Sequence, residues 1–578
     1  MLPGKMNDRS ARPRGLPTCG TRIRKMRLIG MSGLLLPALA FTQVLQPLAI
    51  PPLLDMDTFD LVVDDHVHQF FPGVNTTTYG VNGVVLGPTL VLHSGSMAHI
   101  RLHNELPVWT NMHWHGLHIS GEADGAPPRQ INPGETWAVD FPVMNAAATF
   151  WYHPHPHMMT MDHVNKGLAG FIIVRDDAEA ALQLPRTYGV DDFPIVVQDR
   201  NFLPSGDFAS GPYGDTVLVN GTPNAYVEMP AQIVRLRLLN GSNARIFRLG
   251  FDDGHAFHVI GSDGGLLNGP VEVDRMTVSN GERYEVLLDL SGMEGDSLLL
   301  MSFGSELTPT MPGAFNPTWE PSILNGVDFP VLRIRVTAPT TEPVTTIPNT
   351  LTHVELPDLA DVSRTRWKSF SGFGTPGSGM FMINDLMFDL DVINDTVLLG
   401  ATERWVVENA TDMAHVFHIH GGSFYVLQRN GQPPPEWERG AKDVIMTDMA
   451  DNVEFIMEFN DYVSDGWPYM YHCHNLVHED GMMMLQYIVV DPNTHVAPVP
   501  DDETMTVFPS PFTSSFTFQT DFAVREVRLN DMLGRTVLRQ PMDGRTRGVI
   551  DALTLPAGPY VLRLKGDDRT VQRVVVRE

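Results

Sequence analysis

Between residues 472 and 483 the chain reads HCHNLVHEDGMM. Two histidines flank a cysteine, a third histidine follows four residues after His474, and two methionines close the stretch. Successive side chains of a β-strand point to opposite faces. On a strand, His472 and His474 therefore share one face and Cys473 points to the other. The stretch predicts a β-strand that serves two metal-binding sites at once.

The cysteine face of this strand offers the ligands of a mononuclear site. Cys473, His478 and Met483 supply a thiolate, an imidazole and a thioether within eleven residues. This donor set, completed by a second imidazole, is typical of trigonal copper sites, whereas zinc sites usually hold more cysteines. His415 is available as the second imidazole. Met483 is preferred over its methionine neighbours because it lies ten residues after Cys473.

The histidine face predicts a metal cluster. Histidines make up 22 of the 578 residues, and several occur in His-x-His pairs whose side chains share a strand face. Three copper ions need about eight imidazoles. The chain offers that number: His113, His115, His153, His155, His418, His420, His472 and His474.

Composition predicts an all-β protein with several domains. The 50 glycines and 45 prolines suit many short strands joined by tight turns. Three strand-rich blocks, residues 57–177, 191–340 and 359–492, each have the size of one β-sandwich. A strand ending in Asn precedes the histidine segments of the first and third blocks, which predicts a repeated module.

The N-terminal residues have the pattern of a secretory signal peptide. A basic cluster precedes the apolar stretch Leu28–Ala40, which ends in a cleavage-site pattern. Met26 is an alternative start, with residues 1–25 a start-site artefact. The apolar stretch is too short to span a membrane, and no later one reaches about 18 residues. We therefore predict an exported protein with no membrane span.

Removal of residues 1–40 leaves a strongly acidic chain with one cysteine. The formal charge of −28 becomes −35, and Cys19 is lost. An acidic surface disfavours nucleic acid as a partner and attracts cations. One cysteine cannot form a disulfide within the chain, and a lone exported thiol needs a ligand or protection.

In this order and spacing, the histidine, cysteine and methionine motifs resemble the multicopper oxidases, in particular three-domain bacterial laccases, bilirubin oxidases and cuprous oxidases. The likeness covers about residues 57–492 and includes the segments Asn111–Leu117, Trp151–His155, Ser262–Leu267 and His474–Asp480. It implies three cupredoxin-like Greek-key β-sandwich domains. The middle domain would hold no type 1 copper.

The resemblance also implies four copper ions and a role for each motif. O2 would be reduced to water after four one-electron transfers. Asp124 and Glu479 match acidic residues that relay protons. The type 1 copper would be held by His415, Cys473, His478 and Met483, the type 2 copper by His113 and His418, and the type 3 pair by His115, His153, His155, His420, His472 and His474.

The C-terminal residues 507–578 differ from the acidic body. They carry eleven basic and eight acidic residues and follow a Pro/Asp-rich linker, 493–506. The segments Val507–Phe512, Asp531–Arg535 and Leu555–Tyr560 resemble the C-terminal sorting domain of type IX secretion. This resemblance implies a small β-sandwich, the type IX machinery as a partner, and a secreted or cell-surface location.

Three functions are weighed for the whole chain. The first is a laccase-like oxidase that takes electrons from phenols or aromatic amines. The second is an oxidase of Cu(I) or Fe(II) in copper tolerance, suggested by the methionines and the negative charge. The third is a secreted copper-sequestering protein, which would need no His-Cys-His link. A two-domain nitrite reductase is disfavoured by the three blocks.

Two methionine-containing stretches bear on this choice. Cuprous oxidases often carry a long Met-rich insertion over the type 1 site, where this chain has the short, Gly- and Ser-rich stretch Ser363–Met380. The short stretch predicts open access for organic donors, although Met380, Met382 and Met387 remain nearby. The stretch from His157 to His163 is either an ordinary loop or a Cu(I) docking site.

Overall fold

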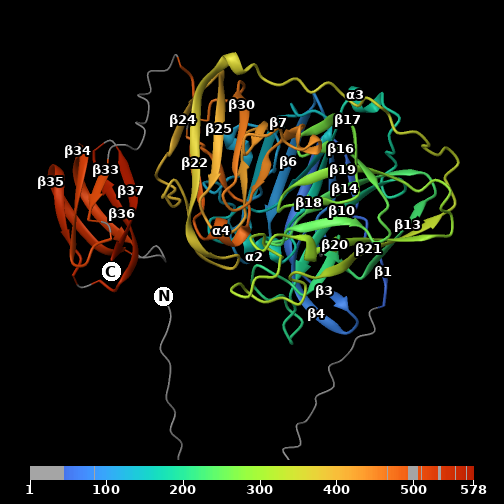
Figure 1. The fold of residues 1–578 in the computed structure, drawn as a ribbon, viewed down its shortest axis with the longest axis horizontal. Helices are drawn as coiled ribbons and strands as arrows, with labels where there is room; N and C mark the ends of the chain where they lie inside the picture. Colours follow the sequence, from blue (N-terminus) through green and yellow to red (C-terminus); the bar gives the residue numbers. More distant parts are fainter. Residues whose placement is uncertain are drawn as a thin grey trace, which may run out of the picture. The chain divides into compact units, whose positions relative to one another are not determined.

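The computed structural model describes residues 44–83, 85–464, 466–492, 505–509, 511–530, 536–553, 555–567 and 569–577. Strands dominate these residues, and the helices among them are short (Figure 1). The predicted all-β class is therefore confirmed. The predicted signal peptide, residues 1–40, and the Asp531–Arg535 segment of the tail lie outside the described residues.

The first β-sandwich follows from alternating apolar and polar side chains. In strand β3, Phe59, Leu61 and Val63 are fully buried, whereas the residues between them face outward. They pack in one core with Ile100 and Leu102. Two sheets, ordered β2-β5-β9-β8 and β4-β3-β6-β7, enclose this core, with β2 Leu53–Asp55, β3 Thr58–Phe71, β4 Val74–Val81, β5 Thr89–His93, β6 Met97–Asn104, β7 Thr136–Pro142, β8 Ala148–Tyr152 and β9 Gly170–Arg175.

The second β-sandwich is covered on more than one side. Its strands β10 and β14 are buried at every residue, because Val196 and Leu239 pack against Trp151 and Phe171 of the first sandwich. The short strand β1 pairs in parallel with β13 and so adds residues from outside the predicted block 191–340.

Two sheets form this second sandwich, in the orders β1-β13-β21-β20-β15-β18 and β12-β11-β10-β14-β19-β16-β17. The strands are β1 Gln46–Pro47, β10 Asp192–Arg200, β11 Thr216–Val219, β12 Thr222–Pro223, β13 Ala225–Pro230, β14 Ile233–Asn240, β15 Phe247–Phe251, β16 Phe257–Ser262, β17 Gly265–Val273, β18 Met276–Val278, β19 Arg283–Asp289, β20 Ser297–Phe303 and β21 Asp328–Thr337.

The third β-sandwich carries most of the predicted ligands. Its core includes Trp405, Phe417 and Tyr471, together with Cys473 and Met483. Its sheets are ordered β23-β22-β25-β30-β27-β28 and β24-β32-β31-β26-β29. The strands are β22 Val362–Thr375, β23 Ser378–Ile383, β24 Asp395–Leu398, β25 Ala401–Asn409, β26 His415–Ile419, β27 Phe424–Arg429, β28 Ala441–Lys442, β29 Val444–Thr447, β30 Asn452–Phe459, β31 Tyr469–Cys473 and β32 Met484–Val490.

Short helices lie in the connections between strands. The α-helices are α1 Gly121–Asp124, α2 Thr160–Asn165, α3 Asp177–Ala180 and α4 Leu476–Asp480, and the 3-10 helices are η1 Gly304–Glu306, η2 Leu359–Asp361 and η3 Glu436–Glu438. Helices α2 and α4 touch, because the carboxylate of Asp480 accepts hydrogen bonds from the backbone N–H groups of Thr160 and Met161, each at 2.9 Å.

The same asparagine turn occurs in all three sandwiches. Asn104, Asn240 and Asn409 each end a strand, and each side chain donates to two carbonyls and accepts from the N–H two residues on. In the first and third sandwiches the turn leads into a histidine segment, while in the second it does not. The repeated module predicted from the sequence is present, and it sets where the histidine segments begin.

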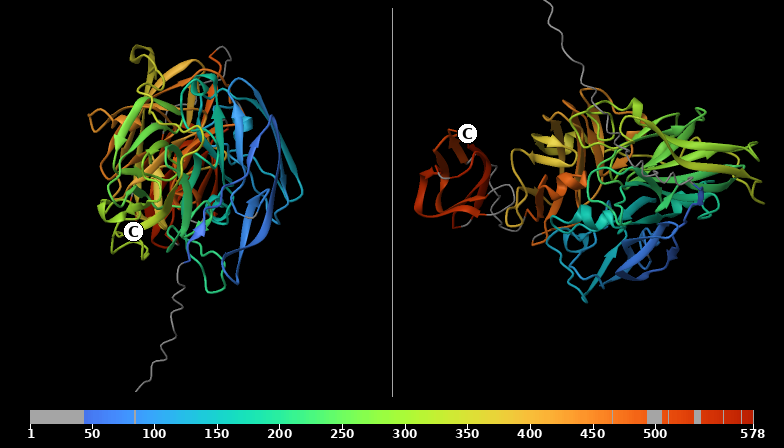
Figure 2. Two further views of the ribbon diagram at one scale, coloured as in Figure 1. Left: turned by 90° about the vertical axis from the view of Figure 1, so that its right-hand side faces the viewer. Right: turned by 90° about the horizontal axis from the view of Figure 1, so that it is seen from below.

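The tail forms a small β-sandwich (red in Figure 2). Its strands are β33 Met505–Phe508, β34 Ser515–Asn530, β35 Thr536–Asp551, β36 Gly558–Lys565 and β37 Thr570–Arg577. The long strand β34 pairs with β33 near its start and with β36 near its end, so one strand contributes to both layers. Phe516, Phe518 and Leu562 lie fully buried between the layers.

Candidate metal centre

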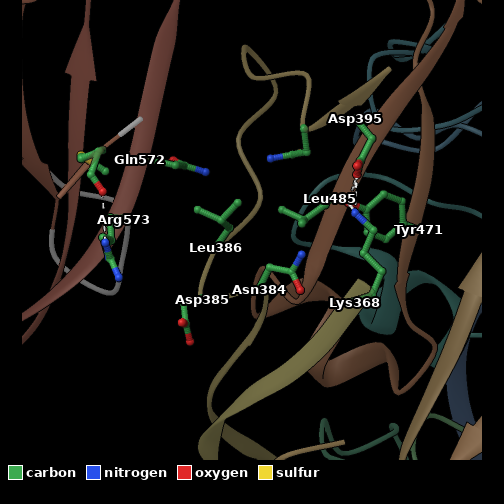
Figure 3. A pocket seen from close by; sticks show the side chains of 11 residues that line it. Lys368, Asn384, Asp385, Leu386, Asp395, Tyr471, Leu485, Gln572 and Arg573 are labelled. Atoms are coloured by element: carbon green, nitrogen blue, oxygen red, sulfur yellow. Dashed lines mark hydrogen bonds and ion pairs between the residues drawn. The ribbon is translucent and has the colours of Figure 1, made fainter. Parts of the chain in front are cut away.

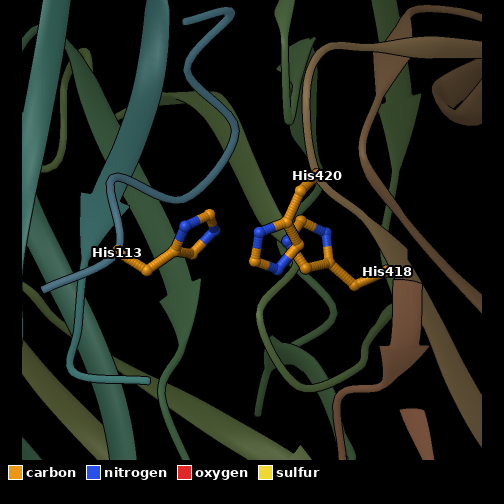
Figure 4. A group of neighbouring side chains, drawn as sticks. All are labelled: His113, His418 and His420. Atoms are coloured by element: carbon orange, nitrogen blue, oxygen red, sulfur yellow. The ribbon is translucent and has the colours of Figure 1, made fainter. Parts of the chain in front are cut away.

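Eight histidines from the first and third sandwiches converge in one buried cluster. Each is at most 2% exposed. Nε2 of His472 lies 3.2 Å from Nε2 of His155 and 3.3 Å from Nε2 of His420. Figure 4 shows His113 from the first sandwich facing His418 and His420 from the third. The cluster contains all eight histidines predicted for it: His113, His115, His153, His155, His418, His420, His472 and His474.

Strand-like alternation places these side chains. Trp114 is fully buried in the core of the first sandwich, so its neighbours His113 and His115 point the other way, into the cluster. The backbone of His113 hydrogen-bonds to that of His153 in both directions, at 2.8 and 3.2 Å. This bridge brings two of the predicted His-x-His pairs side by side.

Four cluster nitrogens have no hydrogen-bond partner among the described residues: Nε2 of His113 and His418, and Nδ1 of His155 and His474. Nδ1 of His113 donates to the carbonyl of Asp124 at 2.9 Å, and Nδ1 of His418 donates to the carbonyl of Asp443 at 2.8 Å. A ring nitrogen that faces a carbonyl must carry the proton, so Nε2 keeps its lone pair. Both Nε2 atoms are buried and unpartnered, which is costly unless a cation is bound. The donor set fits a metal that prefers imidazole, such as copper.

Burial also keeps imidazoles of the cluster neutral. Desolvation is the largest cause that lowers the pKa values of His115, His153 and His155 well below the ordinary range, and neighbouring histidines lower them further. Neutral imidazole is the form that binds metal. The cluster is therefore prepared for a cation at neutral pH.

A second site surrounds Cys473. Its Sγ lies 3.5 Å from Nδ1 of His415 and 3.8 Å from Nδ1 of His478, and Met483 is fully buried in the same core cluster. Burial raises the pKa of the Cys473 thiol to about 12. This thiol therefore needs a bound cation to ionise at neutral pH. One sulfur anion, two imidazoles and a thioether are the donors of a trigonal copper site.

Strand β31 joins the two sites. It pairs antiparallel with β26, with Phe417 opposite Cys473 and His418 opposite His472. His472 and His474 reach the histidine cluster, whereas Cys473 reaches the second site. The alternation inferred from the sequence thus describes the observed directions of all three side chains.

A buried charged network supports β31 beside these ligands. The Tyr471 hydroxyl donates to Asp395, and Lys368 Nζ lies 2.6 Å from the same carboxylate and 3.0 Å from the Tyr471 hydroxyl (Figure 3). Buried charges are costly unless they are paired. The network therefore fixes the strand residue that precedes His472.

Asp124, predicted as a proton-relay residue, contacts two cluster histidines. Its Oδ2 lies 2.8 Å from Nδ1 of His420 and 3.4 Å from Nδ1 of His113. Burial alone would raise the pKa of Asp124, but the nearby His420 and His113 outweigh burial and lower it. Asp124 is therefore ionised at neutral pH.

Glu479, the second predicted relay residue, lies on α4 beside the opposite part of the cluster. Its two carboxyl oxygens lie 3.3 Å from Nδ1 of His155 and 3.2 Å from Nδ1 of His472. Burial, with a smaller contribution from Asp480, raises its pKa well above the usual range. Two carboxyl groups with oppositely shifted pKa values at one site are suited to accept and deliver protons.

The expectation of open access to the mononuclear site is wrong. Strands β22 and β23 form a hairpin whose Thr375 carbonyl accepts a hydrogen bond from Nε2 of His478 at 3.1 Å. The ring centroid of Phe381 lies 4.7 Å from that of His415 and 4.4 Å from that of His478. His478 is only 3% exposed. The short stretch is rich in glycine, which allows the two strands of the hairpin to pair closely. The hairpin therefore folds back over the site.

Other histidines lie apart from the two sites. Among the described residues, each group of three or more His, Cys, Asp and Glu side chains with metal-binding spacing is made of predicted ligands, apart from one that includes Asp443. The stretch that begins at His157 turns into α2, and the His157 ring lies 5.3 Å from the ring of Phe388. His255 and His258 of the second sandwich belong to no such group.

Asp443 and Arg283 were missed by the sequence analysis. Asp443 Oδ1 lies 3.0 Å from Nε2 of His115, and the Arg283 guanidinium pairs with the Asp443 carboxylate. Both residues are fully buried. The sequence does indicate that these residues are paired. Lys442, Asp443 and Arg283 stand within apolar strand patterns, and a charge buried in such a strand needs a partner.

Comparison with known proteins identifies the family. Multicopper oxidase models match residues 63–179, 197–313 and 352–493, and a secretion system C-terminal sorting domain matches residues 506–577. The chain belongs to the multicopper oxidase family, whose members bind copper. Its tail is a sorting domain of type IX secretion, consistent with a secreted or cell-surface protein.

Individual relatives differ in what they are named for. The multicopper oxidase mco of Staphylococcus haemolyticus is 33% identical over 438 residues, covering 73% of this chain and 86% of the relative. The cell division protein FtsP of Rahnella sp. is 36% identical over 452 residues, covering 75% and 91%. The solved structure of a laccase-like multi-copper oxidase, CueO, from Ochrobactrum sp. has a TM-score of 0.69 and 33% identity, covering 77% of this chain and all of that one.

No helix within the described residues is both long enough and apolar enough to cross a membrane.

Proposed function

We propose that this chain is a four-copper, laccase-like oxidase that couples four one-electron oxidations of phenols or aromatic amines to the reduction of O2 to water. The observation that carries the proposal is the end of strand β31 with the residue that follows it. Cys473 lies beside His415 and His478, whereas His472 and His474 lie in the histidine cluster. A protein that only stores copper needs no such connection.

The two groups of side chains divide the ligands between a mononuclear site and a cluster, and the family resemblance divides the cluster ligands between type 2 and type 3 copper. The mononuclear type 1 copper would be held by His415, Cys473, His478 and Met483. The type 2 copper would be held by His113 and His418, and the type 3 pair by His115, His153, His155, His420, His472 and His474. When bound, the copper ions would supply one-electron redox chemistry on the cysteine side and reduction of O2 in the cluster.

The protein residues supply the route for electrons and protons. Peptide bonds join Cys473 directly to His472 and to His474, so few covalent bonds separate the two sites. The reduction of one O2 to two waters consumes four protons, and the buried ligands leave little room for bulk water. Glu479, whose raised pKa keeps it protonated, would deliver protons to the cluster, and ionised Asp124 would pass further protons on toward it.

At the mononuclear site, the structure favours electron transfer from a donor through the β22–β23 hairpin. Because Thr375 covers Nε2 of His478, a donor would contact the β22–β23 hairpin rather than the ring itself. Aromatic donors are supported by the Ochrobactrum relative, which is described as having oxidase activity towards lignin model compounds. We further propose that residues 1–40 direct export and that the tail then engages the type IX machinery.

Copper content, visible absorption and oxygen uptake test the proposal together. The purified protein is expected to bind about four copper ions per chain, to show the blue absorption of a copper–thiolate site, and to consume O2 when a phenol is added. A protein that holds copper but shows neither absorption nor uptake would be a sequestering protein instead.

A metallo-oxidase acting on Cu(I) or Fe(II) is the second candidate. Met380, Met382, Met387 and Met482 pack together in one cluster, and thioethers favour Cu(I). Turnover on Cu(I) and Fe(II) should be compared with turnover on a phenol at equal donor concentration. A preference for either metal ion by more than about tenfold in kcat/KM would select this second function.

A further inference from the structure

The imidazole of His115 has the opposite orientation to the imidazoles of His113 and His418. Nδ1 of His115 lies 3.3 Å from Nε2 of His153 and 3.3 Å from Nε2 of His474. Its Nε2 points away from them, toward Oδ1 of Asp443. His113 and His418 have the reverse arrangement, with Nδ1 bonded outward to a backbone carbonyl. The side chain of Asp443 therefore determines which nitrogen of His115 faces the cluster, whereas backbone carbonyls do so for His113 and His418.

Asp443 is itself held rigidly. The guanidinium of Arg283 binds both carboxylate oxygens, each at 2.6 Å. Its remaining N–H donors meet the carbonyls of Gly281, Asp263 and Thr149 at 3.0, 2.9 and 3.1 Å. Every donor of this buried guanidinium is thus used, so the carboxylate has one available orientation.

The three residues come from three different sandwiches. His115 belongs to the first, Arg283 begins β19 of the second, and Asp443 lies between β28 and β29 of the third. A Cβ atom added at Gly116 would lie 2.4 Å from Oδ2 of Asp443 and 2.8 Å from Nη2 of Arg283. The chain next to His115 is therefore fitted closely around the ion pair.

We propose that Asp443 and Arg283 are positioning residues that hold His115 with Nδ1 toward the cluster. This inference rests on the proposed function, which makes His115 a copper ligand. The carboxylate accepts a hydrogen bond from the Nε2–H group of His115, so the proton stays on Nε2 and the lone pair on Nδ1. The Asp443 carboxylate lies close to His115 and His418. Because Arg283 occupies both of its oxygens, this carboxylate is prevented from binding copper itself. The second sandwich, which supplies no predicted ligand, thereby orients a ligand of the first.

Two variants and one control test this role. Asp443→Asn keeps the shape of the side chain but places an amide against either His115 or Arg283. Arg283→Lys keeps the charge but loses the two-pronged contact. Arg237→Lys is the matched control, because Arg237 is equally buried and forms the same two-pronged pair with Asp192, at 2.7 and 2.8 Å, without contacting a predicted ligand.

The copper of the Cys473 site serves as an internal standard in each full-length protein. Copper per chain is measured by mass spectrometry during titration with a chelator, and the blue absorption reports the Cys473 site. Thermal unfolding of the metal-free proteins reports the structural cost. We expect both test variants to retain cluster copper about 10–100-fold less strongly, as found for other outer-shell partners of metal ligands, while the blue absorption per chain stays unchanged. Arg237→Lys should lower the unfolding temperature but not the copper retention.

Other outcomes overturn the inference. Wild-type retention of cluster copper in the folded variants would do so, as would parallel loss of copper from both sites. Failure of both test variants to fold beside a folded Arg237→Lys would assign the pair a structural role only. A wild-type protein without cluster copper would instead defeat the proposed function, so the two failures are distinguishable.

Discussion

The imidazole of His478 donates from Nε2 to the backbone carbonyl of Thr375, 3.1 Å away. Thr375 lies near the tip of the β22–β23 hairpin, and that tip is tied to the second sandwich. The Thr375 hydroxyl donates to the Glu320 carboxylate, and the N–H of Gly377 lies 3.3 Å from the same group. A donor molecule therefore meets a closed hairpin, and Glu320 holds it closed.

Loosening this hairpin should favour bulky donors. Glu320→Ala removes both contacts to the tip, each charge-assisted and worth about 1.5–3 kcal/mol. We expect KM for a bulky phenol to fall by about three- to tenfold, the latter equivalent to about 1.4 kcal/mol. Turnover of a small inorganic reductant should not change. Steady-state kinetics with a series of phenols of increasing size provide the measurement.

Glu306→Ala is the control for this prediction. Glu306 lies in the same sandwich and pairs with Arg248, away from the hairpin. If the two variants give equal KM values across the phenol series, the hairpin does not limit access.

Replacement of Cys473 by serine should separate the two metal sites. The Cys473→Ser protein loses the sulfur that faces His415 and His478 but keeps the eight cluster histidines. We expect loss of the blue absorption, retention of about three copper ions per chain, and at least a 10³-fold fall in O2 uptake with a phenol, since an electron path is removed. Copper analysis and an oxygen electrode check this. Residual uptake near the wild-type rate would mean that electrons enter the cluster by another path.

Local patterns made much of this arrangement predictable from the sequence. The alternation of strand side chains gives the directions of His472, Cys473 and His474, and the strand-ending Asn104 and Asn409 mark where histidine segments begin. These are short-range effects, set by residues close together in the chain.

Contacts between distant segments were not predictable in the same way. Asp443 and Arg283 are 160 residues apart, and neither stands in a metal-binding motif. The closed hairpin was misjudged because a glycine- and serine-rich stretch is consistent with both a loose loop and a tight turn. Its contacts with His478 and Glu320 decide between them, and both depend on tertiary packing.

The ion pairs of Glu285 predict how stability depends on pH. Burial raises the pKa of Glu285, but Arg235 and Arg237 outweigh it and bring the value to about 2. A carboxylate with a lowered folded-state pKa stabilises the fold above its unfolded pKa, and this contribution is lost as pH falls from about 4.5 toward 2. The shift corresponds to about 3 kcal/mol.

Glu285→Gln should therefore be less stable than the wild type by at least about 3 kcal/mol at pH 7. The difference in the free energy of unfolding should shrink as the pH is lowered below about 4.5. Urea unfolding of the metal-free proteins at a series of pH values measures it. A difference that stays constant between pH 7 and pH 3 would show that the ionised carboxylate contributes nothing.

Gly281 of the second sandwich should be essential for the cluster beyond its effect on folding. It has φ = +77°, and a Cβ atom there would lie 3.0–3.1 Å from three atoms of the His474 ring. Gly292 has φ = +78° in the same sandwich, with nothing within 4 Å of its Cβ position. Alanine at either position costs about 1–2 kcal/mol for the left-handed backbone, but only Gly281→Ala also pushes on a predicted ligand.

Comparison of the two alanine variants isolates the steric effect of the added Cβ atom on the His474 ring. We expect similar unfolding temperatures for the metal-free proteins, a full complement of copper in Gly292→Ala, and a loss of about one to two cluster copper ions from Gly281→Ala, since His474 can no longer keep its place. The blue absorption should persist in both, because Cys473, His415 and His478 do not contact Gly281. Equal copper contents would mean that the His474 ring can shift without releasing its metal, and that the second sandwich does not shape the cluster at this point.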